Sequence, residues 1–266
     1  MNEYSIVVKN LSKSFKNIHA VKNISFQVEK GGCFGLLGSN GAGKSTTIKM
    51  MTSLLSIDSG EIEICSNNIK TQPLAIRKLI GYVPQSLSVD GTLTAYENLM
   101  LFSKLYGISK KYRKDRITQI VKMFDLEEVA NRQVKTFSGG MVRRLEIGQA
   151  ILHNPEVLFL DEPTVGLDPV ARKNVWHHIE QLRTNYNMTI ILTTHYMDEA
   201  ESMCSNIAIM SQGEIVVNGT LAQLKEKIGN NDASMDDIYT HFAGNSQMKG
   251  ELKDVTATRR MAQRLG

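Results

Sequence analysis

The stretch GSNGAGKST, residues 38–46, combines closely spaced glycines with a lysine and two hydroxyl side chains. It matches the pattern G-x-x-x-x-G-K-[ST] in full, and it lies between an apolar run that favours a buried strand and a run that favours a helix. Glycines let backbone N–H groups turn toward one anion, and the positive end of the helix dipole adds to that attraction. The stretch predicts a phosphate site; a plain glycine-rich turn is the alternative.

Individual residues of this stretch have separate expected roles. Lys44 can reach the β- and γ-phosphates of a nucleotide, and the Ser45 hydroxyl can ligate Mg²⁺. The residues expected to contact the nucleotide from this loop are Gly38, Ser39, Asn40, Gly41, Ala42, Gly43, Lys44, Ser45 and Thr46.

Two adjacent acids follow an apolar run in EVLFLDEP, residues 156–163. The run predicts a buried strand whose carboxyl end carries Asp161 and Glu162 to the edge where open parallel sheets bind ligands. We expect Asp161 to hold the Mg²⁺ shell and Glu162 to orient or deprotonate an attacking water. Either acid alone could be an acidic turn at a strand end, but the phosphate-binding stretch on the same chain favours hydrolysis.

The elements that would position these groups follow from the hydropathy pattern. Alternation with a period of two favours half-buried strands, and short apolar runs favour fully buried ones. Such stretches occur at residues 4–10, 24–31, 32–38, 60–67, 156–162, 188–195 and 207–219, the last being a hairpin that turns at Gln212–Gly213. Strands that alternate with helices in this way predict an α/β fold.

Helical periodicity marks two regions. The first follows the phosphate-binding stretch and places one apolar face on Ile48, Met51, Leu54 and Leu55. The second runs from Thr94 to about Leu152 and opens with a capping box of Thr94 and Glu97. Apolar residues recur in it at spacings of three and four: Ile117, Ile120, Val121 and Phe124. This second region predicts a helical lobe inserted into the α/β pattern.

Length and composition are those of an ordinary globular protein. The chain has 266 residues, 42% hydrophobic and 22% charged, so it can bury a substantial core. A net charge of +4 is too small to indicate nucleic acid as a partner. No window approaches about 18 consecutive apolar residues, and the N-terminus lacks the apolar core of a signal peptide. We therefore expect a chain that neither spans a membrane nor enters one unaided.

Several motifs occur together in the order of one known family. After the phosphate-binding stretch come GYVPQ (81–85), FSGGM (137–141), GGMVRRLEIGQAI (139–151), FLDEPTVGLDP (159–169) and the histidine that ends TIILTTH (189–195). Over about residues 4–225, the chain resembles the ATP-binding subunit of an ABC transporter. The sequences of its motifs are similar to those of the multidrug and daunorubicin-resistance type of ABC exporter ATPase.

The resemblance implies a fold and a division into domains. It implies an α/β P-loop NTPase core with an N-terminal antiparallel β subdomain and an inserted α-helical subdomain. We expect the ATP-binding domain to span residues 1–228, with the helical subdomain at about 92–152, and a C-terminal extension of unassigned role at 229–266. The implied ligands are ATP and Mg²⁺.

The resemblance also assigns roles to residues outside the phosphate loop. Phe15 matches the aromatic that stacks on adenine, with a buried core aromatic as the alternative. Gln85 matches the residue that touches Mg²⁺ and water; alone it would be a loop amide. His195 matches the histidine that contacts the γ-phosphate, where a structural histidine is the alternative. Asp168 matches the acid of a loop along the dimer interface.

The FSGGM turn raises the question of what must approach a Ser-Gly-Gly backbone so closely. In the family it resembles, this turn starts a helix and caps the γ-phosphate bound to the other subunit, with Ser138, Gly139 and Gly140 as donors. A Cβ there would hold the two surfaces apart. The family's usual Leu and Gln around this turn are Phe137 and Met141 here, and Met141 cannot hydrogen-bond to a nucleotide sugar as Gln would.

One basic stretch has no place in this chemistry. Residues 104–116 carry six basic side chains against the single acid Asp115. A solvated connection between helices is the plainer interpretation. The sharper one is attraction to anionic lipid, since the helical lobe would face the membrane subunit.

Together these features predict an ATPase subunit that powers an ABC transporter through ATP-driven closure of a dimer. The resemblance of its motifs implies that the transporter is an exporter. The expected partners are a second copy of the chain and an integral membrane permease, at the cytoplasmic face of the membrane, with no nucleic acid. One alternative is a soluble ABC-type ATPase acting on DNA or ribosomes, which would need long coiled coils or tandem cores. Another is a nucleotide-binding switch without turnover, which Glu162 and His195 together disfavour.

Overall fold

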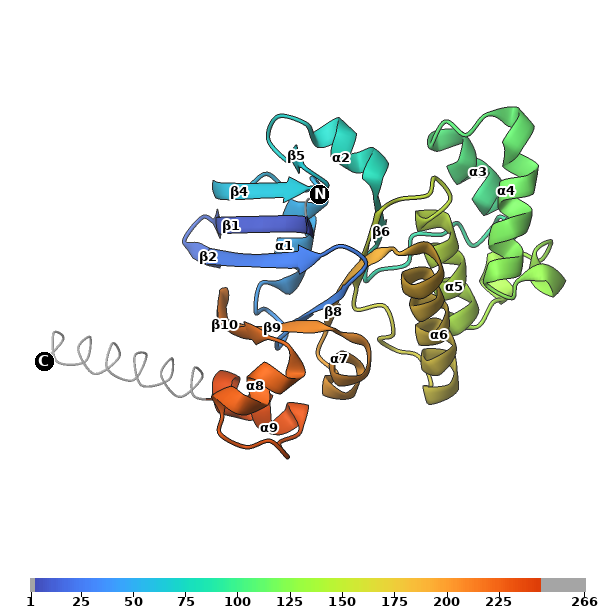
Figure 1. The fold of residues 1–266 in the computed structure, drawn as a ribbon. Coiled ribbons are helices and arrows are strands. Elements are labelled where there is room, and N and C mark those ends of the chain that lie inside the picture. The colour runs from blue at the N-terminus through green and yellow to red at the C-terminus, as the bar shows by residue number, and fades with distance from the viewer. Residues whose placement is uncertain (1–2, 245–266) are drawn as a thin grey trace, which may run out of the picture.

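The computed structural model describes residues 3–244 and builds them around two β-sheets (Figure 1). The larger sheet has the strand order β10 (Glu214–Gly219), β9 (Asn206–Ser211), β3 (Cys33–Leu37), β8 (Thr189–Thr194), β7 (Val157–Asp161) and β6 (Ile80–Val83). β10 pairs antiparallel with β9, whereas all the other paired neighbours in this sheet run parallel. The carboxyl ends of β3, β6, β7 and β8 therefore meet at one edge, which is where such sheets bind ligands.

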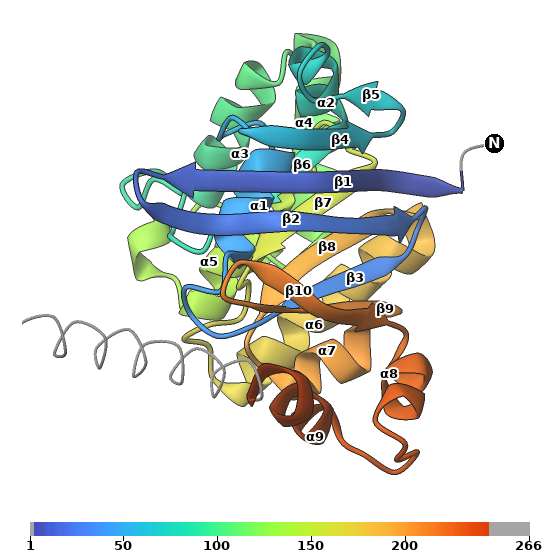
Figure 2. The same ribbon diagram turned by 90° about the vertical axis from the view of Figure 1, so that its left-hand side faces the viewer.

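The smaller sheet is antiparallel, and Figure 2 shows it lying across one side of the larger one. Its strand order is β2 (Ile18–Glu29), β1 (Tyr4–Phe15), β4 (Ser59–Ile64) and β5 (Asn67–Asn68). In β2 the buried residues Ile24, Phe26 and Val28 alternate with exposed ones, because only one face of this sheet is covered. This confirms the predicted N-terminal antiparallel subdomain.

The central strands are buried throughout and largely apolar, because both faces of the larger sheet are covered. Every residue of β3, β7 and β8 is buried. On β7, Val157 and Phe159 pack in the cluster that holds the antiparallel sheet. Leu158 and Leu160 pack in the cluster that holds the helical lobe. The strand residues therefore form the middle layer between the two subdomains.

Helices cover the larger sheet and form the lobe at its side (Figure 1). They are α1 (Lys44–Met51), α2 (Pro73–Leu79), α3 (Ala95–Leu105), α4 (Lys110–Met123), α5 (Gly139–Ala150), α6 (Pro169–Tyr186), α7 (Met197–Met203), α8 (Leu221–Lys227) and α9 (Met235–Tyr239). Short helical turns occur at Glu127–Val129, Val134–Thr136 and Thr240–Gly244.

The predicted helical lobe is confirmed in its start and in its buried face. Thr94 caps α3 in a full capping box, since its hydroxyl accepts from the Glu97 N–H and the Glu97 carboxylate accepts from the Thr94 N–H. The four apolar positions predicted for the second half of the lobe are all buried: Ile117, Ile120, Val121 and Phe124. The capping box and the apolar periodicity thus each fix one part of this lobe.

The helix after the phosphate loop is shorter than its apolar periodicity predicts. It ends at Met51, and Ser53 has a φ of 58°, so the chain leaves the helix there. Leu54, expected on the apolar face, is 62% exposed, whereas Leu55 still packs against the core. The prediction for Leu54 was wrong because its periodicity continues beyond the turn that ends the helix.

Residues 229–244, which the sequence pattern does not place, pack onto the core. Met235 and Ile238 of α9 are buried with Ile207 and Ile209 of β9 in a third apolar cluster. The division at residue 228 stays a prediction, and the rest of the predicted extension, 245–266, lies outside the described residues.

Candidate functional site

The phosphate loop follows β3 and ends where α1 begins. Two of its glycines have left-handed backbone angles, with φ of 82° at Gly41 and 107° at Gly43. A side chain at Gly43 would also collide with the chain, since a Cβ there would lie 2.6 Å from the Ala20 carbonyl oxygen. Glycine is therefore required for the loop to curl against β2 and aim its backbone N–H groups inward.

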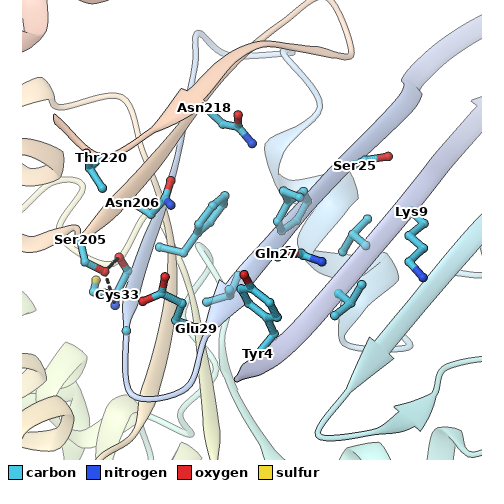
Figure 3. Close-up of a pocket in the computed structure, with 16 residues that line it drawn as sticks. Tyr4, Lys9, Ser25, Gln27, Glu29, Cys33, Ser205, Asn206, Asn218 and Thr220 are labelled. Atoms are coloured by element: carbon cyan, nitrogen blue, oxygen red, sulfur yellow. Dashed lines mark hydrogen bonds between the residues drawn. The ribbon is translucent and has the colours of Figure 1, made fainter. Parts of the chain in front are cut away.

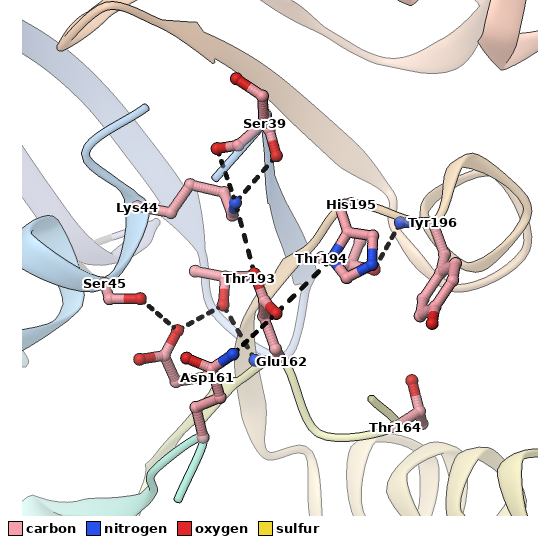
Figure 4. Close-up of polar contacts among 12 residues, drawn as sticks. Ser39, Lys44, Ser45, Asp161, Glu162, Thr164, Thr193, Thr194, His195 and Tyr196 are labelled. Carbon is pink, nitrogen blue, oxygen red and sulfur yellow. Dashed lines mark hydrogen bonds and ion pairs between the residues drawn. The ribbon is translucent and has the colours of Figure 1, made fainter. Parts of the chain in front are cut away.

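Lys44 is folded back over the loop that precedes it. Its Nζ donates to the carbonyl oxygens of Gly38, at 2.8 Å, and Ser39, at 3.1 Å. The same Nζ lies 3.4 Å from the carboxylate of Glu162, and both side chains are buried (Figure 4). The loop thus holds a buried cation over the space that its N–H groups surround.

Asp161, at the end of β7, lies behind Ser45. Its Oδ1 accepts from the Ser45 hydroxyl at 3.0 Å and from the Thr193 hydroxyl at 2.6 Å. Ser45 and Asp161, two of the residues expected to hold Mg²⁺, therefore lie next to each other. Thr193 has no predicted role, and Figure 4 shows it between the two acids, from the adjacent strand β8.

Glu162 lies at the centre of the cluster and is only 5% exposed. Its φ is 49°, and this turn is fixed by its N–H, which donates to the Thr193 hydroxyl at 2.9 Å. Its Oε2 accepts from Gln85 Nε2 at 3.1 Å and lies 3.5 Å from His195 Nδ1. Gln85 and His195, whose roles were expected separately, thus both lie against the carboxylate of Glu162.

A pocket of about 380 Å³ opens over these groups. It is lined by Ala20, Asn40, Gly41, Ala42, Gly43, Lys44, Ser45, Thr46, Gln85 and Glu162. Most of the predicted loop residues therefore face one space, while Gly38 and Ser39 hold Lys44 instead. Phe15 does not line this pocket; it is 45% exposed, so the alternative of a buried core aromatic is wrong.

The donor set fits Mg²⁺. This ion prefers oxygen ligands and is usually held by one or two protein oxygens together with substrate phosphates and water. Ser45 and Asp161 offer two such oxygens 3.0 Å apart at the edge of the pocket. Within residues 3–244, no group of three or more His, Cys, Asp or Glu side chains could hold a metal ion without further ligands. Any Mg²⁺ here would therefore depend on the nucleotide for the rest of its shell.

The segment that contains Gln85 is fastened to α5 by a buried ion pair. Arg143 donates to the carbonyl oxygens of Pro84, at 2.9 Å, and Gln85, at 3.2 Å. Glu146, 3.0 Å from Arg143, accepts from the Ser88 N–H at 2.5 Å. Burial raises the pKa of Glu146, although Arg143 and Ser88 act in the opposite direction. The helix that begins at the Ser-Gly-Gly turn is thus coupled mechanically to Gln85.

The Ser-Gly-Gly turn lies outside the pocket of its own chain. Ser138 caps α5 by accepting from the Met141 N–H at 3.4 Å, and both Ser138 and Gly139 are exposed. Gly140 is buried, and a Cβ there would lie 2.8 Å from the Cβ of Ala171 in α6. Part of the need for glycine is therefore a contact inside the chain, which corrects the explanation based only on a second subunit.

Asp168 has an identifiable role within its own chain. Its Oδ1 accepts from the N–H groups of Val170 and Ala171, both at 2.9 Å, and so caps the start of α6. This cap also sets the position of Ala171 against the Ser-Gly-Gly turn.

A further buried carboxylate, unpredicted by the sequence, connects two sides of the site. Glu199 of α7 accepts from Thr164, from Thr194 at 2.8 Å and from Trp176 at 3.2 Å. Thr164 comes two residues after Glu162, and Thr194 comes directly before His195. The last two threonines of TIILTTH were the available signal, since a polar pair ending a buried strand needs hydrogen-bond partners.

A larger pocket, of about 510 Å³, lies at the opposite end of β3 (Figure 3). Its walls include Phe26 and Phe34, whose rings stack 4.9 Å apart, and Ser205, whose hydroxyl is bonded to the backbone of Cys33. This pocket contains none of the predicted site residues and lies away from the carboxyl edge of the sheet. The chemistry of the chain is therefore concentrated in the smaller pocket.

Comparison with known proteins agrees with this geometry. The ABC transporter family profile matches residues 21–165. The linearmycin resistance ATP-binding protein of Bacillus subtilis is 43% identical over 83% of this chain and 71% of its own length. The daunorubicin/doxorubicin resistance ATP-binding protein of Streptomyces peucetius is 38% identical over 85% of this chain and 68% of its own length.

Solved structures give the same result. The structure of an ATP-binding subunit of an ABC transporter superposes with a TM-score of 0.80 at 30% identity, over 89% of this chain and 98% of that one. A dimeric ATP-binding cassette in a post-hydrolysis state, bound to ADP and Pi, superposes with a TM-score of 0.74 at 27% identity, over 81% and 98% of the two chains. The predicted fold class and resemblance are confirmed, and the alternative of an ATPase acting on DNA or ribosomes gains no support.

Proposed function

The chain belongs to the ABC transporter family as an ATP-binding and ATP-hydrolysing subunit, and from that premise we propose that it powers export through a separate membrane permease. In this proposal two copies close on ATP, hydrolyse it to ADP and phosphate, and reopen. ATP shifts this equilibrium because it binds the closed dimer better than the open one.

One observation carries the proposal: the carboxylate of Glu162 is surrounded by three groups from separate parts of the chain. Lys44 lies 3.4 Å away, Gln85 donates at 3.1 Å, and His195 lies 3.5 Å away. A buried carboxylate at the edge of the pocket lined by the phosphate loop is positioned to orient a water molecule toward the γ-phosphate and to accept the proton of that water. A site for binding alone would not need this acid.

The neighbouring residues have complementary roles in the proposal. The N–H groups of the phosphate loop and Lys44 bind the phosphate oxygens, and Ser45 and Asp161 hold Mg²⁺. Bound Mg²⁺ supplies charge that stabilises the phosphate oxygens during transfer. The Nδ1 atom of His195 faces Glu162, and the side chain is still 35% exposed, so the imidazole can also contact the γ-phosphate.

The second half of each site would come from another copy of the chain. Ser138 and Gly139 are exposed and do not line their own chain's pocket. Their N–H groups and the Ser138 hydroxyl begin a helix, which suits an anion offered by a facing surface. The dimeric state of one structural relative, bound to ADP and Pi, supports this arrangement.

The proposal includes a transported cargo and a place in the cell. Two relatives are named for resistance to linearmycin and to daunorubicin or doxorubicin, which supports export of toxic small molecules. In the part of the chain that the structure describes, no helix is long and apolar enough to cross a bilayer. We therefore assign the membrane passage to a permease and place this subunit peripherally at the cytoplasmic face of the membrane.

The substitution Glu162→Gln tests the proposal, with Glu201→Gln as a matched control on exposed surface. Glu162→Gln should leave ATP binding intact, slow turnover by about 10²–10⁴-fold and let an ATP-bound dimer accumulate in size-exclusion chromatography. The control should hydrolyse ATP like the wild type. Near-normal turnover in Glu162→Gln would reject this residue as the base or water-orienting group.

A further inference from the structure

Six basic residues lie at the junction of α3 and α4, at the outer end of the helical lobe (Figure 1): Lys104, Lys110, Lys111, Arg113, Lys114 and Arg116. The two arginines turn inward. Arg113 Nε donates to the Ile108 carbonyl oxygen at 2.7 Å. Arg116 donates to the carbonyl oxygens of Leu152, at 2.9 Å, and Ile151, at 2.7 Å. These arginines fasten the lobe together, so their charges have a structural use.

The four lysines have no such use. Lys104, Lys110, Lys111 and Lys114 are all exposed, and none of their ammonium groups forms a hydrogen bond or an ion pair with another residue in the range 3–244. Lys111 Nζ lies 5.4 Å from the centroid of the Tyr112 ring. Four cations therefore project from a short segment without an acidic partner in residues 3–244.

Two of these lysines oppose the stability of α4, whereas Lys104 lies in the last turn of α3, where a positive charge is favourable. Lys110 and Lys111 are the first two residues of the helix, and the first turn contains no acid. Ser109, which precedes them, makes no side-chain capping bond. Positive charge at a helix N-terminus is unfavourable, because the dipole is also positive there. Lysines that destabilise a helix N-terminus, with no compensating ion pair in residues 3–244, are expected where the residues serve a function.

Exposed apolar side chains lie among the lysines. Leu105 is 71% exposed, Tyr112 59% and Leu101 43%. Cations mixed with exposed leucine and tyrosine suit the boundary between lipid headgroups and acyl chains, where the cations meet phosphate and the apolar groups leave water. A nucleic-acid site would use arginine and aromatic stacking, and exposed leucines would serve no purpose there.

We propose that this lysine surface (Leu101, Lys104, Leu105, Lys110, Lys111, Tyr112 and Lys114) binds the anionic headgroups of a lipid bilayer. The contact would orient the helical lobe toward the membrane before or while a permease is engaged. It uses none of the residues around the nucleotide pocket, so it stands or falls separately from the proposed ATPase mechanism.

Binding of the purified chain to lipid vesicles tests the proposal directly. The vesicles contain phosphatidylcholine with or without phosphatidylglycerol, and no permease. One variant replaces Lys104, Lys110, Lys111 and Lys114 by glutamine. The matched control makes the same charge change with four exposed lysines elsewhere. They are Lys9 in β1, Lys30 just after β2, Lys70 just after β5 and Lys78 in α2.

We expect wild type and control to sediment with the anionic vesicles, and binding to fall with added salt. Each lysine near an anionic surface contributes about fivefold in affinity, so the loss of two such contacts would already weaken binding by about twenty-five-fold; we expect the lysine-surface variant to bind at least about tenfold more weakly. Leu105→Ser combined with Tyr112→Ser should also weaken binding, at unchanged salt dependence. ATP hydrolysis by both quadruple variants should match the wild type.

Three results would overturn the proposal. Equal losses in the two quadruple variants would show that net charge alone attracts the chain to lipid. If the lysine-surface variant bound anionic vesicles as tightly as the wild type does, these lysines would not contact the headgroups. Normal vesicle binding by that variant together with lost co-purification with a permease would show that the surface contacts protein instead.

Discussion

Replacing Gly140 by alanine should strain the contact between α5 and α6. A methyl group at this position would lie 2.8 Å from the Cβ of Ala171, whereas non-bonded carbon atoms rest at about 3.5–4.0 Å. The two helices must therefore separate, or Ala171 must move. Both positions carry small side chains, so the strain can be relieved from either side.

The magnitude follows from two opposing effects. Overpacking a closely packed contact costs about 1–3 kcal/mol. Alanine stabilises a helix by about 1 kcal/mol relative to glycine, so Gly140→Ala alone should change the free energy of unfolding by about 0–2 kcal/mol. Ala171→Gly alone should cost about 1 kcal/mol. Together the two changes restore the space, and the double variant should be close to the wild type.

Urea unfolding of the four proteins measures the coupling between the two sites. The double variant should be more stable than the sum of the single effects by about 1–3 kcal/mol, which is the clash itself. Additivity within about 0.5 kcal/mol would refute the close contact. Gly139→Ala provides the contrast, because a Cβ there meets only the flexible end of Leu167, at 3.1 Å. That variant should unfold like the wild type yet lose ATPase activity if the turn approaches a second subunit.

Three further predictions concern single residues. Thr193→Val removes the hydroxyl that donates to Asp161 and accepts from the Glu162 N–H, so the free energy of unfolding should fall by about 1–3 kcal/mol; unchanged stability would deny the threonine this role. Phe15→Ala should weaken ATP binding by about 1–3 kcal/mol in a fluorescent-nucleotide titration while Phe15→Trp preserves it, and equal affinities in all three proteins would exclude stacking. Burial lowers the pKa of His178, so the folded state favours its neutral form: this contribution to stability is fully present above the unfolded-state pKa of about 6.5 and is lost as the pH falls through the folded-state pKa. His178→Gln should therefore lose less stability than the wild type between about pH 7.5 and about pH 5.5, and parallel losses in urea unfolding would contradict the assignment.

The positions of site residues could be predicted from the sequence where they depend on the nearest strand or helix, although the roles of these residues stay predictions. Asp161 ends the buried strand β7, Lys44 begins the helix that follows β3 and the phosphate loop, and a parallel sheet brings such strand ends to one edge. Thr193 could not be predicted in the same way. Its contact depends on the pairing of Asp161 with Thr193 between β7 and β8, and periodicity within one strand says nothing about the register between two.

The wrong or incomplete predictions have separate causes: one local turn, one contact between distant helices and one very short helix. The face that includes Leu54 obeys helical periodicity, but the turn at Ser53 ends the helix first. The need for glycine at position 140 was attributed only to an approaching subunit. Its contact with Ala171 joins two helices that are distant in the sequence, so it could not be predicted from the local pattern. The five-residue helix α9 is too short to show a period, although the core buries two of its side chains.

In the proposed dimer, each catalytic site takes its phosphate loop from one subunit and its Ser-Gly-Gly turn from the other. Lys44→Ala disables the first part, and Ser138→Arg blocks the second by its bulk. Neither homodimer should hydrolyse ATP. In a mixture of the two variants, half of the dimers are mixed, and each of these has one site with both defects and one with neither.

A control separates this arrangement from one in which the turn serves its own chain. Wild type mixed with the double variant retains only the activity of residual wild-type homodimers if the sites are shared. If the sites are not shared, its heterodimers add one working site each.

The decisive measurement is the ATPase rate of the mixture of Lys44→Ala with Ser138→Arg. The shared-site account predicts recovery to about a quarter of the wild-type rate. No recovery in this mixture, together with activity from the control heterodimer above that of the residual wild type, would contradict it.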